Sequence, residues 1–552
     1  MLQGMPDHPM DRPRPFAAMT TRPLSESSSA PSSRRRRRGR RAAALISLFS
    51  LVLPTACTST ASDGSRSANG APSALTTQGQ PSEQPPMPSS ADPGVPSSSS
   101  ASAPLSVSVA PTLTSTIPST AAYPDVVDRK GRLLMTKQSV ALIKIEPSKI
   151  GDVSSAAQSI SELVRPIDPT LTASAIAHQI GEITTTFTLV ALRAQLEATQ
   201  IAALTALPGV TSSLHERLIT VDRTLESPLF PQLTTYLSSH PGAASSSALH
   251  TTIDLNVQVS AEAAVNSEVK PAALVVIQPS TGAILAVAQN AAADAAGPIA
   301  LNGLYPPGST FKSITVAQAL DSGQATPSTQ LPCPGSTTIS DRTIPNDGGF
   351  DLGTVSLTTA FAHSCNTTMA QLSAAMPPTA MHTMAARFGL GADFDIAGIT
   401  AVTGTVPAAT TAAQLVEEAI GQWQVVASPF GMALTGATVV AGHTPVPTLI
   451  DGIATKVNTV DIAPPPPSVI TALRTMFQAT VTEGTATALS GLPGAGGKTG
   501  TAQFGDGTHA HGWFVGFDKD LAFSVLVVGG ETSKPAVGAA KLFLEKALPY
   551  TR

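Results

Sequence analysis

Ser309 and Lys312 stand three residues apart and could together carry out nucleophilic catalysis. A serine hydroxyl is a weak nucleophile, and it becomes reactive when a neighbouring base takes its proton. A lysine amine can be that base if burial or a nearby cation keeps it neutral at physiological pH. Residues at this spacing share one face of a helix. The pair therefore predicts a serine nucleophile with a lysine as its general base.

The residues around this pair indicate how it is positioned. Leu304 to Lys312 read Leu-Tyr-Pro-Pro-Gly-Ser-Thr-Phe-Lys, and apolar residues then recur at helical spacing as far as Gly323. This pattern predicts a rigid loop followed by a helix whose first turn begins at Ser309. The positive end of that helix would favour an anion at the serine. A lone Ser-x-x-Lys is more often a capping serine followed by a solvated lysine, so other residues must decide.

Two further motifs complete a pattern. Ser364-Cys365-Asn366 lies between two stretches of helical character, and Lys498-Thr499-Gly500-Thr501-Ala502 begins a strand-like run. Ser-x-x-Lys, Ser-x-Asn and Lys-Thr-Gly in this order resemble the signature of penicillin-binding proteins and serine β-lactamases. The longer matches from Leu249 onward resemble the transpeptidase domain of class B penicillin-binding proteins, of the lipoprotein-like actinobacterial type. These matches include 305–312, 364–367, 497–502 and 512–517.

The catalytic residues predicted from these motifs are Ser309, Lys312, Ser364 and Lys498. Ser309 attacks a peptide carbonyl, and Lys312 takes its proton. Lys312 must be neutral, which burial or the neighbouring positive charge of Lys498 would achieve. Ser364 relays a proton between the lysines and the leaving amine.

The predicted substrate-binding residues are Asn366, Thr499, Gly500 and Thr501. Asn366 offers an amide to the substrate backbone, and Gly500 lets a substrate strand lie close. The resemblance implies that Thr499 and Thr501 bind a substrate carboxylate together with Lys498. It also implies an oxyanion hole formed by the backbone N–H groups of Ser309 and Thr501.

The first 120 residues predict export and a tether. Residues 1–57 contain a basic block at 34–41, an apolar stretch at 42–53 and Cys57, an arrangement typical of an export signal. Leu53-Pro-Thr-Ala-Cys57 resembles a bacterial lipobox whose cysteine becomes lipidated, with Pro54 as a departure from it. Residues 58–120 are rich in Ser, Pro, Ala and Thr and predict a disordered tether. We therefore expect an exported protein anchored at the outer face of the cell membrane by a lipid on Cys57, with a cleaved signal or a short helical anchor as alternatives.

Two folded regions are expected after the tether. Residues 121–247 alternate helical and strand-like patterns without a catalytic motif, and they predict a small non-catalytic α+β pedestal domain. One strand is expected at 184–192. Residues 248–552 hold the three motifs and predict a transpeptidase domain with strand patterns at both of its ends. The predicted fold class is α+β, with an antiparallel sheet covered by helices on both sides as in serine β-lactamases.

Composition narrows the ligands that are expected. Charged residues make up 13% of the chain and the formal net charge is −4, so nothing points to nucleic acid. No Cys/His cluster has zinc-ligand spacing, and neither a metal nor a cofactor is expected. Three cysteines exclude a disulfide-built scaffold. Cys333 and Cys365 could pair in an oxidising compartment, and the sequence leaves their pairing open.

The predicted function is that of a peptidoglycan D,D-transpeptidase, which cross-links stem peptides through a Ser309 acyl-enzyme and is inhibited covalently by β-lactams. The resemblance implies a separate membrane glycan polymerase as a partner. A D,D-carboxypeptidase or slow β-lactamase would use the same site with water as the acceptor. A non-catalytic cell-wall scaffold is a further alternative. His509 and His511 are expected in a solvated loop.

Overall fold

The computed structural model describes residues 123–166, 171–189, 196–222, 225–240, 242, 248–459 and 462–551. The predicted export signal with Cys57 and the predicted tether at 58–120 lie outside the described residues. No helix in the described ranges is both long and apolar enough to cross a membrane.

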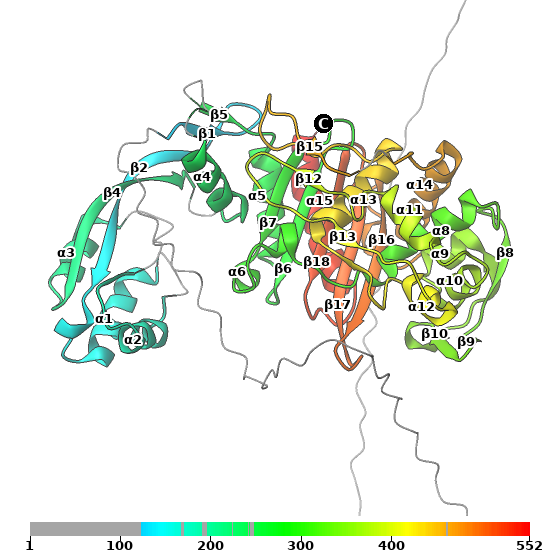
Figure 1. Cartoon of the computed structure of the whole chain (residues 1–552), viewed down its shortest axis with the longest axis horizontal. Helices are drawn as coiled ribbons and strands as arrows, with labels where there is room; N and C mark the ends of the chain where they lie inside the picture. The colour runs from blue at the N-terminus through cyan, green and yellow to red at the C-terminus, as the bar shows by residue number, and fades with distance from the viewer. Residues whose placement is uncertain are drawn as a thin grey trace, which may run out of the picture. The chain divides into compact units, whose positions relative to one another are not determined.

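A five-stranded sheet in the order β16-β17-β18-β6-β7 forms the centre of the catalytic region (Figure 1). Its strands are β6 (Ala272–Ile277), β7 (Ile284–Gln289), β16 (Ala495–Phe504), β17 (His509–Asp518) and β18 (Leu521–Val527). Every neighbouring pair is antiparallel, which confirms the predicted sheet. The residues of β6, β7 and β18 are all buried, because both faces of these strands are covered.

Helices cover both faces of this sheet. On one face, α5 (Leu255–Val265) and α15 (Lys534–Ala547) share an apolar core with Phe514 and Phe523. On the other face lies α13 (Pro429–Ala441), in a second core that includes Trp513 and Val515. Ser428 begins α13 by accepting a hydrogen bond from the N–H of Gly431, with proline at the first helical position. The predicted α+β class is therefore confirmed.

The chain between β7 and β16 carries most of the site. Its helices are α6 (Ala291–Asp294), α7 (Ile299–Asn302), α8 (Lys312–Asp321), α9 (Leu357–Ala362), α10 (Asn366–Ser373), α11 (Ala380–Ala386), α12 (Ala412–Glu418) and α14 (Pro467–Thr482). Its short strands form two-stranded sheets: β8 (Gln330–Cys333) with β11 (Gly353–Ser356), β9 (Ser336–Ile339) with β10 (Arg342–Pro345), β12 (Phe394–Asp395) with β15 (Lys456–Val457), and β13 (Gly404–Thr405) with β14 (Val426–Ala427).

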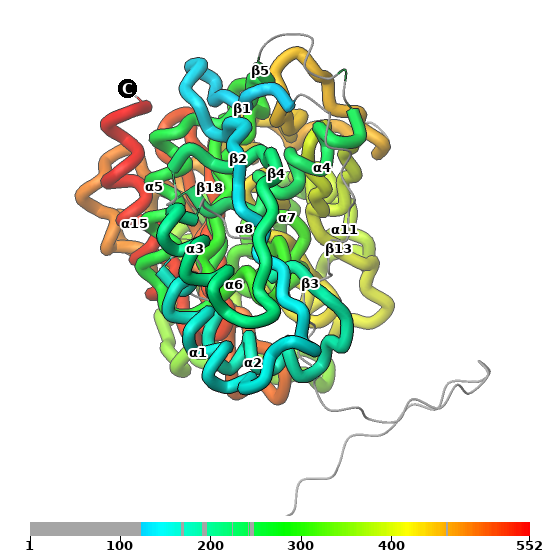
Figure 2. The backbone as a smooth tube through the Cα atoms, turned by 90° about the vertical axis from the view of Figure 1, so that its left-hand side faces the viewer, coloured from blue at the N-terminus to red at the C-terminus, as the bar shows by residue number. Residues whose placement is uncertain are grey.

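The region predicted as a pedestal contains a second sheet with its own helices. Its strands are β1 (Asp125–Val127), β2 (Leu133–Ile145), β3 (Phe187–Thr188), β4 (Val210–Thr220) and β5 (Ala248–His250), and its helices are α1 (Val153–Val164), α2 (Ala173–Glu182), α3 (Ala198–Thr205) and α4 (Leu229–Ser239). β2 and β4 pair along eleven residues, and their tubes run side by side in Figure 2. Within the strand expected at 184–192 the structure describes β3, whose Phe187 and Thr188 pair with β2, and Leu189 donates a further backbone hydrogen bond to Ile143 of β2 at 2.8 Å. Residues 190–192 lie outside the described residues. The domain boundary at 247/248 stays a prediction.

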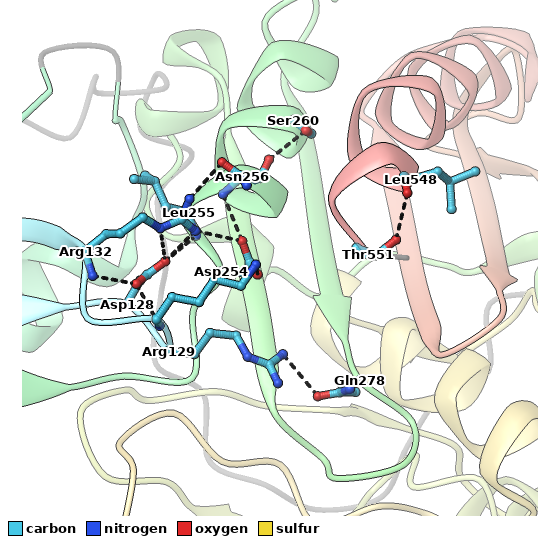
Figure 3. A network of polar contacts seen from close by, with 11 residues as sticks. Asp128, Arg129, Arg132, Asp254, Leu255, Asn256, Ser260, Gln278, Leu548 and Thr551 are labelled. Carbon is cyan, nitrogen blue, oxygen red and sulfur yellow. Dashed lines mark hydrogen bonds and ion pairs between the residues drawn. The ribbon is translucent and has the colours of Figure 1, made fainter.

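A buried ion-pair network joins the β1–β2 turn to the start of α5. The Asp128 side chain is fully buried, and the Arg132 guanidinium donates to it at 2.6 and 2.8 Å. Arg132 also donates to Asp254 at 3.0 Å, and the N–H of Leu255 donates to Asp128 at 3.2 Å (Figure 3). β1 lies parallel to β5 beside this network.

Candidate active site

The loop before Ser309 is held at three points. Tyr305 and Ala427 exchange two backbone hydrogen bonds of 3.0 and 2.9 Å. The buried indole N–H of Trp513 donates to the carbonyl of Pro306 at 2.9 Å. The N–H of Gly308 donates to the carbonyl of Gly421 at 3.0 Å. These contacts fix the loop against the central sheet, so Ser309 is presented by a rigid segment.

Gly308 allows this loop to touch β16. Its φ is +51°, and a Cβ atom there would lie 2.6 Å from the carbonyl oxygen of Thr501. A larger residue would therefore clash with the strand and adopt a disfavoured backbone conformation. Ser309 follows immediately and is half-buried. The sequence predicted an α-helical turn starting at Ser309, but Gly308–Phe311 form a 3-10 turn and α8 begins at Lys312.

Lys312 is completely buried and reaches the Ser-x-Asn motif. Its Nζ donates to the Ser364 hydroxyl at 3.0 Å, to the Ser364 carbonyl at 2.6 Å and to Asn366 Oδ1 at 2.5 Å. Burial, followed by the positive charge of Lys498, holds the pKa of Lys312 well below its usual range, although Asp347 opposes this. A neutral lysine amine can accept the proton of a serine hydroxyl.

Ser364 adopts a left-handed backbone with φ +62°. It follows α9, and its N–H donates to the carbonyl of Phe361 while that of Cys365 donates to Ala360. This is the pattern that usually ends a helix with glycine at the left-handed position. In this conformation both the hydroxyl and the carbonyl of Ser364 accept hydrogen bonds from the Lys312 amine. Such an outlier suggests that function requires the side chain.

Asn346 organises the Ser-x-Asn segment from behind. Its buried side chain accepts hydrogen bonds from the N–H groups of Asn366 at 2.8 Å and Thr367 at 3.2 Å. It also donates to the carbonyls of Pro334 and Phe350, both at 2.9 Å. Asn346 therefore fixes the beginning of α10.

A disulfide joins Cys333 of β8 to Cys365, the central residue of Ser-x-Asn. The pairing that the sequence left open is thus present in the structure. Both cysteines are fully buried, and Phe350 packs against them. The bond ties the segment that carries Ser364 and Asn366 to the two-stranded sheet of β8 and β11.

Lys498 lies on β16 and is fully buried beside the Phe361 ring, with its Nζ 5.4 Å from the ring centroid. Its Nζ donates to the carbonyl of Thr499 at 3.1 Å. Burial lowers the pKa of Lys498 to about 7. The amine therefore changes charge near neutral pH, beside the pair formed by Lys312 and Ser364.

The predicted substrate-binding residues on β16 occupy the free edge of the central sheet. A Cβ atom at Gly500 would lie 2.9 Å from the carbonyl oxygen of Pro307, so glycine permits the serine loop to approach. The Thr499 hydroxyl is buried and 2.6 Å from that of Thr485. Thr501 is half-buried and lies against Gly308.

The structure brings the predicted residues of three distant segments together beside the edge strand β16. Lys312, Ser364 and Asn366 are in direct contact, Lys498 acts on the charge of Lys312, and the serine loop lies against Thr501. Two contributors were missed from the sequence. Asn346 lies in none of the motifs, and Trp513 lies in the 512–517 match but was given no role there.

The expectation of a solvated loop at His509 and His511 was right for the exposure of the His509 side chain and wrong for the loop and for His511. Both begin β17, and His511 is 5% exposed. Its ring stacks on Phe504, with centroids 4.1 Å apart, and meets the edge of Tyr305. Burial lowers the pKa of His511 to about 4, and its Nδ1 accepts from the N–H of Gly529 at 3.2 Å. Apolar packing therefore keeps this imidazole neutral.

This fold and this three-segment site define a class, that of domains with a serine–lysine site beside the edge strand of an antiparallel sheet. More particularly, residues 272–545 match the family described as the penicillin binding protein transpeptidase domain. Among the described residues, no group of three or more His, Cys, Asp or Glu side chains is arranged to hold a metal ion.

Relatives with curated names match the same part of the chain. Peptidoglycan D,D-transpeptidase PbpA of Mycolicibacterium smegmatis is 34% identical over 266 residues, which cover 44% of this chain and 53% of that protein. The protein of the same name in Mycobacterium tuberculosis is 32% identical over 319 residues, with coverages of 49% and 64%. The chain thus spans between about half and two thirds of the length of these relatives.

Solved structures are also similar. The penicillin G acyl-enzyme complex of penicillin-binding protein A from M. tuberculosis shares 28% identity, with a TM-score of 0.48 and coverage of 55% of this chain and 80% of that chain.

Proposed function

We propose that this protein is a peptidoglycan D,D-transpeptidase that cross-links stem peptides through an acyl-enzyme on Ser309. The observation that carries the proposal is the buried Lys312 amine, which contacts Ser364 and Asn366 three residues after the candidate nucleophile. The names of the relatives and the family of residues 272–545 support the same reaction class.

The first half-reaction forms the acyl-enzyme. Neutral Lys312 takes the hydroxyl proton of Ser309, and the serine oxygen attacks the carbonyl carbon of the penultimate D-alanine. The backbone N–H groups of Ser309 and Thr501 stabilise the negative oxygen of the tetrahedral intermediate. Its collapse breaks the peptide bond, and the departing D-alanine amine receives a proton from Lys312 through the Ser364 hydroxyl.

The second half-reaction transfers the acyl group to an amine of a neighbouring stem. That amine attacks the ester carbonyl, gives its proton to the same lysine–serine pair and releases Ser309. A β-lactam would acylate Ser309 in the same way, and its ring-opened product would keep its amine attached. If water is the acceptor instead, the protein is a D,D-carboxypeptidase or slow β-lactamase.

The substrate is proposed to bind as an added strand on the free edge of β16. Its terminal carboxylate would meet Lys498, Thr499 and Thr501, and the Asn366 amide would contact its backbone. At about pH 7 part of the Lys498 population is charged, which favours carboxylate binding.

Further parts of the proposal concern the cell. The apolar stretch at 42–53 and the lipobox-like residues before Cys57 support an exported protein with a lipid anchor at the outer face of the membrane. A separate membrane glycan polymerase is proposed as a partner. A Cys57→Ala variant that still incorporates a lipid label in cells would contradict the anchor.

Labelling with a fluorescent penicillin tests the nucleophile. The purified protein should form a covalent adduct, and Ser309→Ala should abolish it. Ser313→Ala is a matched control, because Ser313 is buried one turn further on and donates to the carbonyl of Thr310. Labelling that survives Ser309→Ala would overturn the assignment. An unlabelled wild-type protein would favour the non-catalytic scaffold.

A product assay tests the acceptor. Stem-peptide donor and excess amine acceptor are incubated with the enzyme, and the products are separated by mass. A cross-linked product that disappears with Ser309→Ala is expected. Release of D-alanine and a shortened stem, without any amine adduct, would contradict the transpeptidase and favour the carboxypeptidase.

A further inference from the structure

Gln422 covers the free edge of β16 at a single residue. The side-chain amide of Gln422 lies against the backbone of Gln503. In the amide orientation that satisfies both of its polar atoms, its nitrogen donates to the carbonyl of Gln503 at 3.3 Å and its oxygen accepts from the N–H of Gln503 at 3.1 Å. One amide thus satisfies the donor and the acceptor that an added peptide strand would use there.

This contact limits the length of strand that β16 can accept. In an antiparallel sheet, alternate residues direct their N–H and C=O groups to the same edge. Thr499 and Thr501 therefore share the free edge with Gln503, and the carbonyl of Thr501 lies beside Gly308. Because Gln422 is hydrogen-bonded to the backbone of Gln503, the stretch of β16 that can still pair with a peptide strand ends after Thr501.

The segment that carries Gln422 is conformationally unusual. Gly421 has φ +72°, and its carbonyl accepts from the N–H of Gly308. Trp423 has φ +63°, a left-handed conformation that bulky residues rarely adopt, and its side chain is 52% exposed. A large aromatic residue is thus held outward directly after the residue that covers the edge.

The direction in which the substrate lies along β16 follows from the roles proposed for Lys498, Ser309 and Thr501. This inference therefore rests on the proposed transpeptidase function. The terminal carboxylate lies toward Lys498, and the carbonyl that is attacked lies at Ser309 and Thr501. The stem residues ahead of the acylated D-alanine therefore run along β16 toward Gln503. In an added strand, the residue two positions ahead of the acylated one would pair with Gln503.

We propose that Gln422 and Trp423 form a specificity-determining subsite for the stem ahead of the acylated D-alanine. Gln422 prevents pairing at Gln503, so the stem leaves the sheet edge within two residues. Trp423 then provides an apolar surface for the methylene groups of those stem residues. The acyl-donor end is bound by backbone pairing with β16, and the remainder of the stem contacts the indole of Trp423.

Two thioester substrates test the role of Trp423. The short one carries a blocked D-alanine as its acyl group, and the long one carries three additional stem residues. The wild-type enzyme should use the long substrate with a lower KM and a similar kcat. Trp423→Gly should raise the KM for the long substrate about tenfold, and this factor corresponds to about 1.4 kcal/mol. The KM for the short substrate should change by less than about twofold. Glycine suits φ +63°, so this variant should fold.

Tyr550→Ala is the control for a lost exposed aromatic side chain, because Tyr550 is 55% exposed in the last turn of the chain. It should leave both substrates unchanged. An unchanged KM for the long substrate in Trp423→Gly would overturn the role of Trp423.

A modified substrate tests the role of Gln422 without altering the protein. N-methylation of the residue two positions ahead of the acylated D-alanine removes the N–H that would donate to the Gln503 carbonyl. The wild-type enzyme should tolerate this change within about twofold, and Gln422→Ala should be slowed about tenfold by it. A tenfold loss in the wild type would show that the stem pairs with Gln503 and overturn the proposal.

Fluorescent penicillin labelling of the same samples distinguishes a failure of the Gln422–Trp423 subsite from a failure of the proposed transpeptidase function. Normal labelling together with unchanged substrate selectivity contradicts only the subsite. No labelling of the wild-type protein contradicts the proposed function itself.

Discussion

Ser364 combines an unfavourable backbone conformation with a side-chain contact to Lys312, the proposed general base. Its φ of +62° suits glycine, yet its hydroxyl lies 3.0 Å from the Lys312 amine. A non-glycine residue in this conformation costs roughly 1 kcal/mol. The serine at this position therefore lowers the stability of the fold and supplies a hydroxyl at the site. Two substitutions can separate the backbone effect from the effect of the hydroxyl.

We expect Ser364→Gly to stabilise the protein by roughly 1 kcal/mol relative to Ser364→Ala, because only glycine relieves the backbone. Both variants should be acylated at least about a hundredfold more slowly, since both lack the proton relay. Denaturant unfolding and penicillin labelling rates measure the two effects. Equal stability of the two variants would contradict the strain at Ser364.

The two buried lysines predict a bell-shaped pH dependence of acylation. Lys312 must be neutral, so the rate should fall as acid protonates it below its depressed pKa. In the proposed function Lys498 binds carboxylate when it is charged, and its pKa is about 7, so the rate should also fall above neutral pH. Because the charges of Lys312 and Lys498 influence each other, the two apparent pKa values of the pH profile describe the pair and not either lysine alone. A β-lactam with an esterified carboxylate should lose the alkaline limb, and an unchanged limb would remove Lys498 from carboxylate binding.

At the scale of elements, the disulfide and Asn346 hold the same segment from two sides. Cys365 is tied to Cys333 of β8, and Asn346 accepts from the first N–H groups of α10. The Ser-x-Asn motif is therefore positioned by covalent and polar contacts that lie outside it.

We expect Cys333→Ser to destabilise the protein by roughly 3 kcal/mol, because the bond closes a loop with a sequence separation of 32 residues. Penicillin acylation should also slow, since Ser364 and Asn366 lose an anchor. Thermal unfolding and labelling rates with and without a reductant provide the measurement. The double variant Cys333→Ala/Cys365→Ala is the control and should not respond to the reductant.

Regular elements were predictable because their patterns are local. The strands at both ends of residues 248–552 have apolar runs, so their presence could be predicted from the sequence. Short strands such as β3 depend on pairing with a distant partner. The motif residues could be identified, but the contact between Gln422 and Gln503 could not, because a single glutamine carries no periodic signal.

At the scale of the whole molecule, the Asp128–Arg132–Asp254 network connects two sheets. Asp128 is fully buried; burial favours its neutral form, but the Arg132 guanidinium and backbone N–H groups outweigh burial and lower its pKa. Its stabilising contribution is therefore present above its ordinary pKa of 3.8 and is lost as the pH falls through the lower folded value.

We expect Arg132→Leu to destabilise the protein by roughly 2 kcal/mol, because it leaves a buried carboxylate without its main partner. Lys137→Met removes an exposed ion pair with Glu216 and should change stability by less than about 0.5 kcal/mol. Denaturant unfolding measures both variants. Penicillin acylation of the folded Arg132→Leu protein should stay normal, and a matching loss of acylation would show that this network also shapes the site.

The hydrogen bond between Trp513 and Pro306 has an optical consequence. The chain has two tryptophans, and one is the buried Trp513, whose indole N–H contacts the loop that presents Ser309. In a Trp423→Phe background, Trp513 becomes the sole indole fluorophore. Its emission would then report on the polarity beside the nucleophile, so the arrival of an unlabelled antibiotic could be followed in real time without a dye.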